Sequence, residues 1–325
     1  MLTSTLSARR LSSAAFARLT RIAVVLLGVI VVTGAAVRLT GSGLGCPTWP
    51  QCGAGSLVTR PEYQLHGVIE FSNRVVGAAV GLLILALPLL ALRQQDGHGR
   101  RRDLVVLGFG LWLGYLGQIV LGGLTVLFHL HPALVAGHFL LSMLLLLDAV
   151  VLDNRARTGR GVREPVAPLP LVRLATALAA TAGLVLLLGT VVTGSGPHAG
   201  DATHAVRRFG FPIRAVAQLH ADVAMLLVGL VVATLVGLHA AGAPTAARRT
   251  GGWVAAAVVG QAGLGFIQYF AGIPTGLVAL HVTGATLLWV LVLHLRMTLT
   301  RPVGPPVPPP EPSRVRVVER ASAGV

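Results

Sequence analysis

Long apolar stretches rich in Leu, Val, Ala and Gly alternate along this chain with short segments that carry most of its Arg residues. A hydrocarbon core of about 30 Å is crossed by roughly 20 apolar residues in a helix, so each long stretch predicts one membrane-spanning helix. The pattern predicts eight, at about 22–40, 65–92, 104–128, 132–152, 171–194, 213–240, 252–270 and 275–297. The expected fold class is an all-α membrane protein with eight transmembrane helices.

The first stretch has a second interpretation. Basic residues precede it and small residues follow it, which is also the arrangement of a cleaved secretory signal. We favour a membrane-spanning helix, because seven further stretches follow and an even number of spans balances the topology.

Composition strengthens the membrane assignment. Of the 325 residues, 54% are hydrophobic and 11% are charged, against roughly 25% charged in a typical soluble domain. The 26 basic residues are all Arg and outnumber the 11 acidic residues, for a net charge of +15. A nucleic-acid-binding protein would present them as a surface stripe, whereas here they lie in clusters between apolar stretches. We therefore expect membrane lipid, and not nucleic acid, as their partner.

The distribution of Arg also predicts the orientation, because cytoplasmic loops carry an excess of basic residues. With the N-terminus inside, 20 of the 26 Arg residues fall on the cytoplasmic side. The six others are Arg38, Arg60, Arg74, Arg207, Arg208 and Arg214. We expect a multi-pass protein of the plasma membrane with both termini in the cytoplasm.

Four short patterns recur in the same order in the two halves of the chain, which indicates an internal repeat. They are Thr40-Gly41-Ser42-Gly43 and Thr193-Gly194-Ser195-Gly196, Gln64-Leu65-His66 and Gln218-Leu219-His220, Gly117-Gln118 and Gly260-Gln261, and the segments 132–138 and 274–281. Each half has an even number of predicted spans, so both halves enter the membrane from the same side. We expect two pseudo-symmetric four-helix bundles related by an axis along the membrane normal.

This repeat divides the chain into five expected parts. They are a cytoplasmic segment at 1–21, an N-terminal half at 22–152 with a cysteine loop at 41–62, a cytoplasmic linker at 153–170, a C-terminal half at 171–298, and a tail at 299–325. The tail is rich in Pro and cannot build a core, so we expect it to be disordered.

Four histidines occupy corresponding places within the predicted spans: His66, His138, His220 and His281. Each lies a few residues past the outer end of its helix, about 10 Å deep for the last spans of the two halves. Facing helices of a four-helix bundle can hold a haem between two such imidazoles. A lone histidine is more often bonded to a neighbouring backbone, and a structural zinc needs four nitrogen or sulfur ligands, which neither half supplies within the membrane.

Glu70 lies one helical turn after His66, on the same face. A carboxyl group within the membrane costs roughly 2.5 kcal/mol or more on insertion scales, and is a functional candidate by default. The corresponding residue of the second half is Ala224, so only the N-terminal half has this acid. Arg74, a further turn along, offers the structural alternative of an ion pair.

Both cysteines, Cys46 and Cys52, lie in the loop after the first span. An extracytoplasmic compartment permits a disulfide between two cysteines this close. A structural disulfide and a redox-active thiol pair both remain open.

The segment from Thr33 to Cys52, with its run Thr40-Gly41-Ser42-Gly43-Leu44-Gly45-Cys46, resembles the first span and cysteine loop of haem A synthases. Ile69-Glu70-Phe71-Ser72-Asn73-Arg74 resembles their Glu-x-x-His-Arg segment, and the surroundings of His138, His220 and His281 resemble those of their other haem-ligating histidines. The resemblance covers about residues 20–298.

The resemblance implies a membrane oxidoreductase that converts the C8 methyl group of haem O to the formyl group of haem A for cytochrome oxidase, with water as the oxygen source. It implies that His220 and His281 hold a haem b by its iron, and that the N-terminal half binds the substrate haem with Glu70 as the catalytic carboxylate. Implied partners are haem O, the haem O synthase and an unidentified electron acceptor, and a homo-oligomer is compatible with the sequence.

This chain departs from the family pattern in two places. Asn73 stands where the motif has His, so we expect His66, two turns earlier on the same face, to ligate the substrate haem together with His138. The second outer loop, from 196 onward, lacks the cysteine pair of some members. Near the outer face, Arg38, Arg74 and Arg214 are candidate propionate contacts, although interfacial anchoring explains each as well.

Two other functions fit parts of the pattern. A di-haem electron carrier, like cytochrome b561 or a quinol-oxidising subunit, would need the four histidines but not Glu70. A transporter built from repeats would favour broken helices, yet Pro is sparse within the spans and Pro88 is the clearest case.

Overall fold

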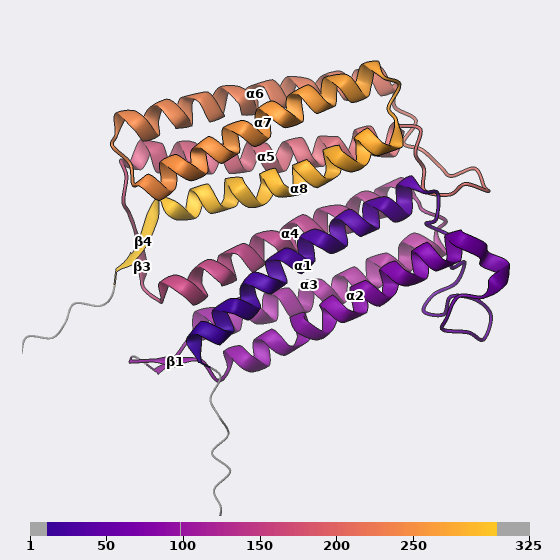
Figure 1. The fold of residues 1–325 in the computed structure, drawn as a ribbon, viewed down its shortest axis with the longest axis horizontal. Helices are drawn as coiled ribbons and strands as arrows, with labels where there is room; N and C mark the ends of the chain where they lie inside the picture. Colours follow the sequence, from indigo (N-terminus) through magenta and orange to yellow (C-terminus); the bar gives the residue numbers. More distant parts are fainter. Residues whose placement is uncertain (1–11, 98, 304–325) are drawn as a thin grey trace, which may run out of the picture.

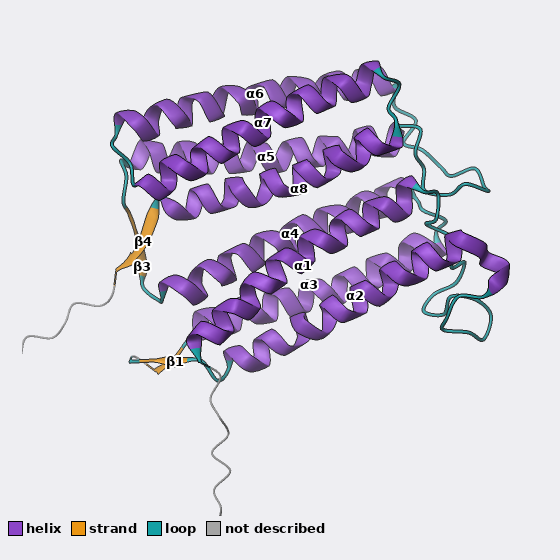
Figure 2. Cartoon of the chain, viewed as in Figure 1, coloured by secondary structure: helices purple, strands orange, loops and turns teal. Residues whose placement is uncertain are grey.

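The computed structural model describes residues 12–97 and 99–303, and its dominant feature is a set of eight long helices that run back and forth side by side (Figures 1 and 2). They are α1 (Ser13–Leu39), α2 (Gln64–Ala91), α3 (Arg102–Leu127), α4 (Pro132–Thr158), α5 (Leu169–Ser195), α6 (Ile213–Ala240), α7 (Thr245–Phe270) and α8 (Thr275–Thr298). Each is long and apolar enough to cross a membrane. The predicted fold class and the eight predicted spans are therefore confirmed, and the protein is a multi-pass membrane protein.

Some helices continue beyond the predicted apolar spans. α1 begins at Ser13, where the hydroxyl of Ser12 accepts a hydrogen bond from the Ala15 amide and caps the helix. α4 continues to Thr158, with Arg155 and Arg157 in its last turn. Basic side chains stabilise the negative end of a helix dipole, so these helices extend past the apolar stretch into polar surroundings.

The helices pack in two neighbouring groups of four (Figure 1). In the first group, α1 and α3 each pack against both α2 and α4, and in the second, α5 and α7 pack against α6 and α8. Contacts of α8 with α1 and α4, and of α4 with α5, join the two groups, and α5 also packs against α8. α1 is thus an integral part of the bundle. The pseudo-symmetry between the groups stays a prediction.

Polar contacts support the seam between the groups. The Trp289 indole of α8 donates to the Met143 carbonyl of α4 at 2.9 Å, in a fully buried position. Within the first group, the Thr20 hydroxyl of α1 donates to Asp153 of α4, which also pairs with Arg157 at 2.6 Å. Large apolar side chains on the outer surfaces are exposed, among them Leu82 at 73% and Val106 at 70%. Outward apolar faces on helices whose backbone groups are bonded internally are what a bilayer requires.

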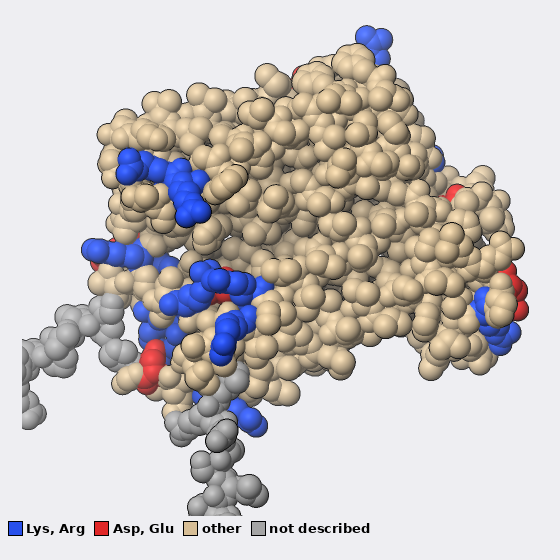
Figure 3. Space-filling model, viewed as in Figure 1, with Lys and Arg blue, Asp and Glu red and all other residues tan. Residues whose placement is uncertain are grey.

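Short elements lie at the ends of the helices. A 3-10 turn, η1 (Pro61–Tyr63), precedes α2, and β1 (Gln95–Asp96) pairs with β2 (Gly99–Arg100) between α2 and α3. Strand β3 (Val162–Pro165), in the linker between α4 and α5, pairs antiparallel with β4 (Thr300–Val303), from Val162 opposite Val303 to Pro165 opposite Thr300. Arg side chains gather at the end of the molecule where these strands lie (Figure 3).

The strand β4 corrects one prediction. Residues 300–303 belong to the tail that we expected to be disordered, but they form a strand because their backbone groups pair with the linker directly after α8 ends. The remainder of the expected tail, 304–325, and the first part of the expected N-terminal segment, 1–11, lie outside the described residues.

Candidate functional site

The C-terminal group brings His220 of α6 and His281 of α8 face to face across its centre. Their ring centroids are 6.5 Å apart, with an interplanar angle of 65°. Two imidazoles that bind one metal ion from opposite sides, each at about 2 Å, have ring centres roughly 6 Å apart. This separation therefore fits the predicted pair of axial ligands.

Glycines on the two neighbouring helices make room for these rings. A Cβ atom on Gly189 of α5 would lie 3.3 Å from Cε1 of His220, and one on Gly265 of α7 would lie 3.4 Å from Cε1 of His281. The Nδ1 atoms of both rings are buried without a hydrogen-bond partner of normal geometry. Buried unpaired polar atoms cost about 1–3 kcal/mol each. Tightly packed rings that face each other at this separation fit a site that is completed by a group bound between them.

His138 of α4 has the same surroundings in the N-terminal group. A Cβ atom on Gly122 of α3 would lie 3.3 Å from its Cε1, and its Nδ1 is also buried and unpaired. The side-chain amide of Gln118 donates to the His138 carbonyl at 3.1 Å, just as Gln261 donates to the His281 carbonyl at 2.8 Å. The helix packing around His138 thus matches that around His281, and its role as a ligand stays a prediction.

His66 and Asn73 do not complete the pair with His138. Nδ1 of His66, in the first turn of α2, lies 2.9 Å from the Ser42 hydroxyl. Asn73 accepts a hydrogen bond from the Thr33 hydroxyl of α1 at 2.8 Å. In the described part of the chain His66 makes no ring contact with His138, unlike the partners in the C-terminal group. The role of His66 as a ligand stays a prediction.

Glu70 is only 6% exposed and is bonded on both of its oxygens. Oε2 accepts from the Cys46 amide at 2.6 Å, and Oε1 accepts from Arg74 at 2.5 and 3.1 Å. Arg74 also donates to the carbonyls of Cys46, Thr48 and Gln51. The ion pair that we weighed as the structural alternative is therefore present, and together the two side chains fasten the cysteine loop to α2.

The cysteine loop is closed by a disulfide between Cys46 and Cys52, both fully buried. Within this loop, the Trp49 indole packs on Gly123 of α3, where a Cβ atom would lie 2.8 Å from the ring. Gly123 follows Gly122, the glycine that faces His138. The loop thus extends from Glu70 to the neighbourhood of His138 and joins the two candidate groups of this half.

The candidate propionate contacts have different surroundings. Arg38 donates to the carbonyls of His198 and Thr193, both at 2.8 Å, and so braces the second outer loop. Arg74 is occupied by Glu70 and the cysteine loop. Arg214, at the start of α6, is exposed and makes no hydrogen bond or ion pair with another described residue. Their role toward propionates stays a prediction.

The two outer loops are joined to each other. The Gly43 amide donates to the Gly200 carbonyl at 2.7 Å, and the Ala202 amide donates to the Gly41 carbonyl at 3.1 Å. Next to this contact, burial alone would raise the pKa of the Asp201 carboxyl, but hydrogen bonds from Thr203 and His204 lower it below its usual value. A charged Asp201 therefore supports the loop at neutral pH.

Sequence reasoning missed the three glycines that face the histidines. A signal was present, because Gly122 and Gly265 each follow the Gln of the Gly-Gln repeat by four residues, one helical turn.

Zinc was the alternative to haem that the sequence left for the histidines. Within residues 12–97 and 99–303, no three His, Cys, Asp or Glu side chains gather as a metal site. A group that needs two protein ligands fits this donor set better than a metal ion alone.

Comparison with known proteins decides the family. The sequence profile of the COX15-CtaA family, described as cytochrome oxidase assembly protein, matches residues 17–293. The chain belongs to this family. In the COX15-CtaA family its relatives include proteins named heme A synthase from Alkalihalophilus pseudofirmus (35% identity over 39% of this chain and 42% of the relative), Exiguobacterium sibiricum (31%, over 57% and 59%) and Shewanella oneidensis (30%, over 48% and 52%).

These pairwise matches span about four to six tenths of the length of each relative. The match to the COX15-CtaA profile covers more of the chain than these pairwise matches. It contains the candidate histidines, Glu70 and the cysteine loop.

Proposed function

We propose that this protein is a haem A synthase, an oxidoreductase of the plasma membrane that oxidises the C8 methyl group of haem O to a formyl group. The paired imidazoles of His220 and His281, together with membership of the COX15-CtaA family, carry the proposal. The names of the relatives support the same activity. We assign the N-terminal half to the substrate haem, because it carries the buried carboxylate of Glu70 within a spanning helix, where the corresponding residue of the other half is Ala224.

His220 and His281 would hold a haem b, with Gly189 and Gly265 leaving space for their rings. When bound, haem b supplies a one-electron redox centre within the membrane. His138 would ligate the iron of the substrate haem from α4, with His66 as the candidate second ligand. The positive end of the protein, rich in Arg, would face the cytoplasm.

Oxidation of a methyl to a formyl group with water as the oxygen source releases four electrons and four protons. Such a reaction needs a proton acceptor at the substrate carbon. Glu70 is fixed by the Cys46 amide and by Arg74, so its carboxylate would hold one position while it accepts protons or stabilises positive charge on the carbon. The electrons would leave to an acceptor that remains to be identified, and the cysteine pair is a candidate carrier between them.

Expression of the full chain together with a haem O synthase, followed by extraction of pigments, tests this function. We expect haem A to form only when both proteins are present. Bound haem without conversion would instead indicate a di-haem electron carrier, and a protein without haem would indicate a transporter. A carrier would not need the buried carboxylate of Glu70, so its presence favours the enzyme.

Gly265→Leu should reduce the haem content of the purified protein several-fold. The new side chain would meet the His281 ring, which has no space to retreat without losing its alignment with His220. Gly263→Leu is the matched control, because this exposed glycine of the same helix has no atom within 4 Å of its Cβ position. Absorbance of the Soret band per protein measures the effect. Equal haem content in the two variants would contradict the assigned packing.

A further inference from the structure

A hollow of about 480 Å³ lies at the Arg-rich end of the molecule, far along α4 from the histidine sites. It is lined by Arg100, Arg102, Asp103, Arg155, Arg160 and Gly161. Four of these six residues are basic and one is acidic. The hollow thus combines a concave shape with an excess of positive charge, and this combination favours the binding of anions.

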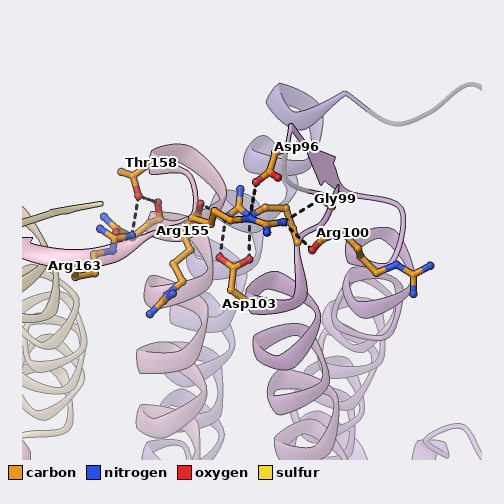
Figure 4. A network of polar contacts seen from close by, with 10 residues as sticks. Asp96, Gly99, Arg100, Asp103, Arg155, Thr158 and Arg163 are labelled. Carbon is orange, nitrogen blue, oxygen red and sulfur yellow. Dashed lines mark hydrogen bonds and ion pairs between the residues drawn. The ribbon is translucent and has the colours of Figure 1, made fainter. Parts of the chain in front are cut away.

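The acidic residues of this region are already taken. Arg101, which is 7% exposed, binds both oxygens of Asp103 at 2.9 and 2.8 Å. Arg160 pairs with Asp96 at 2.8 Å and donates to the carbonyls of Gly99 and Arg100. Figure 4 shows this network, in which Asp96 and Asp103 lie among the arginines. The carboxylates of Asp96 and Asp103 are therefore already paired with Arg160 and Arg101.

Three of the lining arginines have no directly bonded partner among the described residues. The side chains of Arg100, Arg102 and Arg155 make no hydrogen bond or ion pair with another residue of the described ranges. In Figure 4, Arg100 and Arg155 extend away from the dashed contacts, and Arg155 runs back alongside the helices. Burial lowers the pKa of the Arg163 guanidinium, and the positive charges of Arg155 and Arg101 lower it further, against an opposing effect of Asp103. The positive charge here therefore exceeds what the protein itself neutralises.

The hollow lies at the level of lipid headgroups. Arg102 is the first residue of α3, and Arg155 is in the last turn of α4. The apolar spans predicted for these helices, 104–128 and 132–152, end two or three residues away, or about 3–5 Å along the helix. The positive end of the α3 helix dipole adds to the potential here.

We infer that this hollow binds a phosphate group through Arg102 and Arg155, and that the phosphate is the headgroup of an anionic phospholipid. Guanidinium groups bind phosphate oxygens with two parallel hydrogen bonds, which a Lys cannot reproduce. Basic pockets between transmembrane helices bind such headgroups. The hollow is separate from the haem sites proposed above, so this inference stands or falls independently of them.

The test uses the full chain and paired double variants. Arg102→Gln with Arg155→Gln removes two charges from the hollow, and Arg248→Gln with Arg249→Gln removes two exposed charges from the start of α7, at the same end of the bundle. Each protein is purified from vesicles that contain equal amounts of phosphatidylglycerol and phosphatidylcholine, and the retained lipid is measured. We expect the enrichment of phosphatidylglycerol to fall at least about fivefold in the first variant only. Equal enrichment in both variants would overturn the lipid assignment.

A second arm distinguishes the source of the phosphate. Inorganic phosphate is titrated against lipid-free protein in a neutral detergent while the melting temperature is followed. Phosphate could raise the melting temperature of the unmodified protein but not that of the Arg102→Gln, Arg155→Gln variant, while neither protein is enriched in phosphatidylglycerol. That result would keep the phosphate site but assign it to a soluble anion. If neither arm separates the two double variants, the site does not exist. Arg102→Lys with Arg155→Lys preserves the charge and provides a folded variant, which should show an intermediate enrichment.

Discussion

Glu70→Gln should lower haem A formation at least about 100-fold, while the protein keeps the haem held by His220 and His281. A positioned base contributes about 10²–10⁴-fold to a proton transfer, and an amide cannot accept the proton. Gln can still accept the Cys46 amide hydrogen bond, so the loop keeps part of its attachment. The ratio of haem A to haem O in pigment extracts measures the effect.

Two comparisons separate this chemical role from a purely structural one. Glu62→Gln is the matched control, because Glu62 is exposed beside the same loop and, among the described residues, pairs only with Arg60, at 3.6 Å. Arg74→Gln breaks the ion pair but leaves the carboxylate, so it should reduce activity less than Glu70→Gln. Labelling of Cys46 and Cys52 with a thiol reagent reports whether the disulfide survives in each variant. Full haem A production by Glu70→Gln would refute the catalytic role.

The contrast between the two halves shows what the sequence could predict. The eight helices could be predicted because a span is a local property of about 20 residues. The His220–His281 pair could also be predicted, since both residues lie in regular helices at corresponding depths. In both cases the periodicity of the helix and the thickness of the bilayer determine the answer.

The surroundings of Glu70 could not be predicted in the same way. Its partners include the amide of Cys46, 24 residues earlier, in a loop without regular structure. The sequence offered Arg74 as a partner because of helical spacing, but it contained no signal for a backbone amide delivered by a loop. The same limit applies to His66, whose contact with Ser42 depends on how that loop leaves α1. The strand β4 was missed because its pairing partner, β3, lies more than 130 residues earlier in the chain.

His220→Ala should remove nearly all haem from the C-terminal half, with His281→Ala giving the same result. Loss of outer-shell partners alone typically costs 10–100-fold in metal affinity, so we expect loss of a direct ligand to weaken haem binding at least about 100-fold. The remaining imidazole cannot compensate, because the described residues around the pair supply no third His, Cys, Asp or Glu ligand. His239→Ala is the control on the same helix, since His239 is exposed and lies next to the Leu235 carbonyl at the far end of α6. Absorption spectra of the reduced and oxidised proteins measure the loss. A normal spectrum in both His220→Ala and His281→Ala would show that the haem is held elsewhere. The assignment of haem b to the C-terminal half and of the substrate haem to the N-terminal half would then fail.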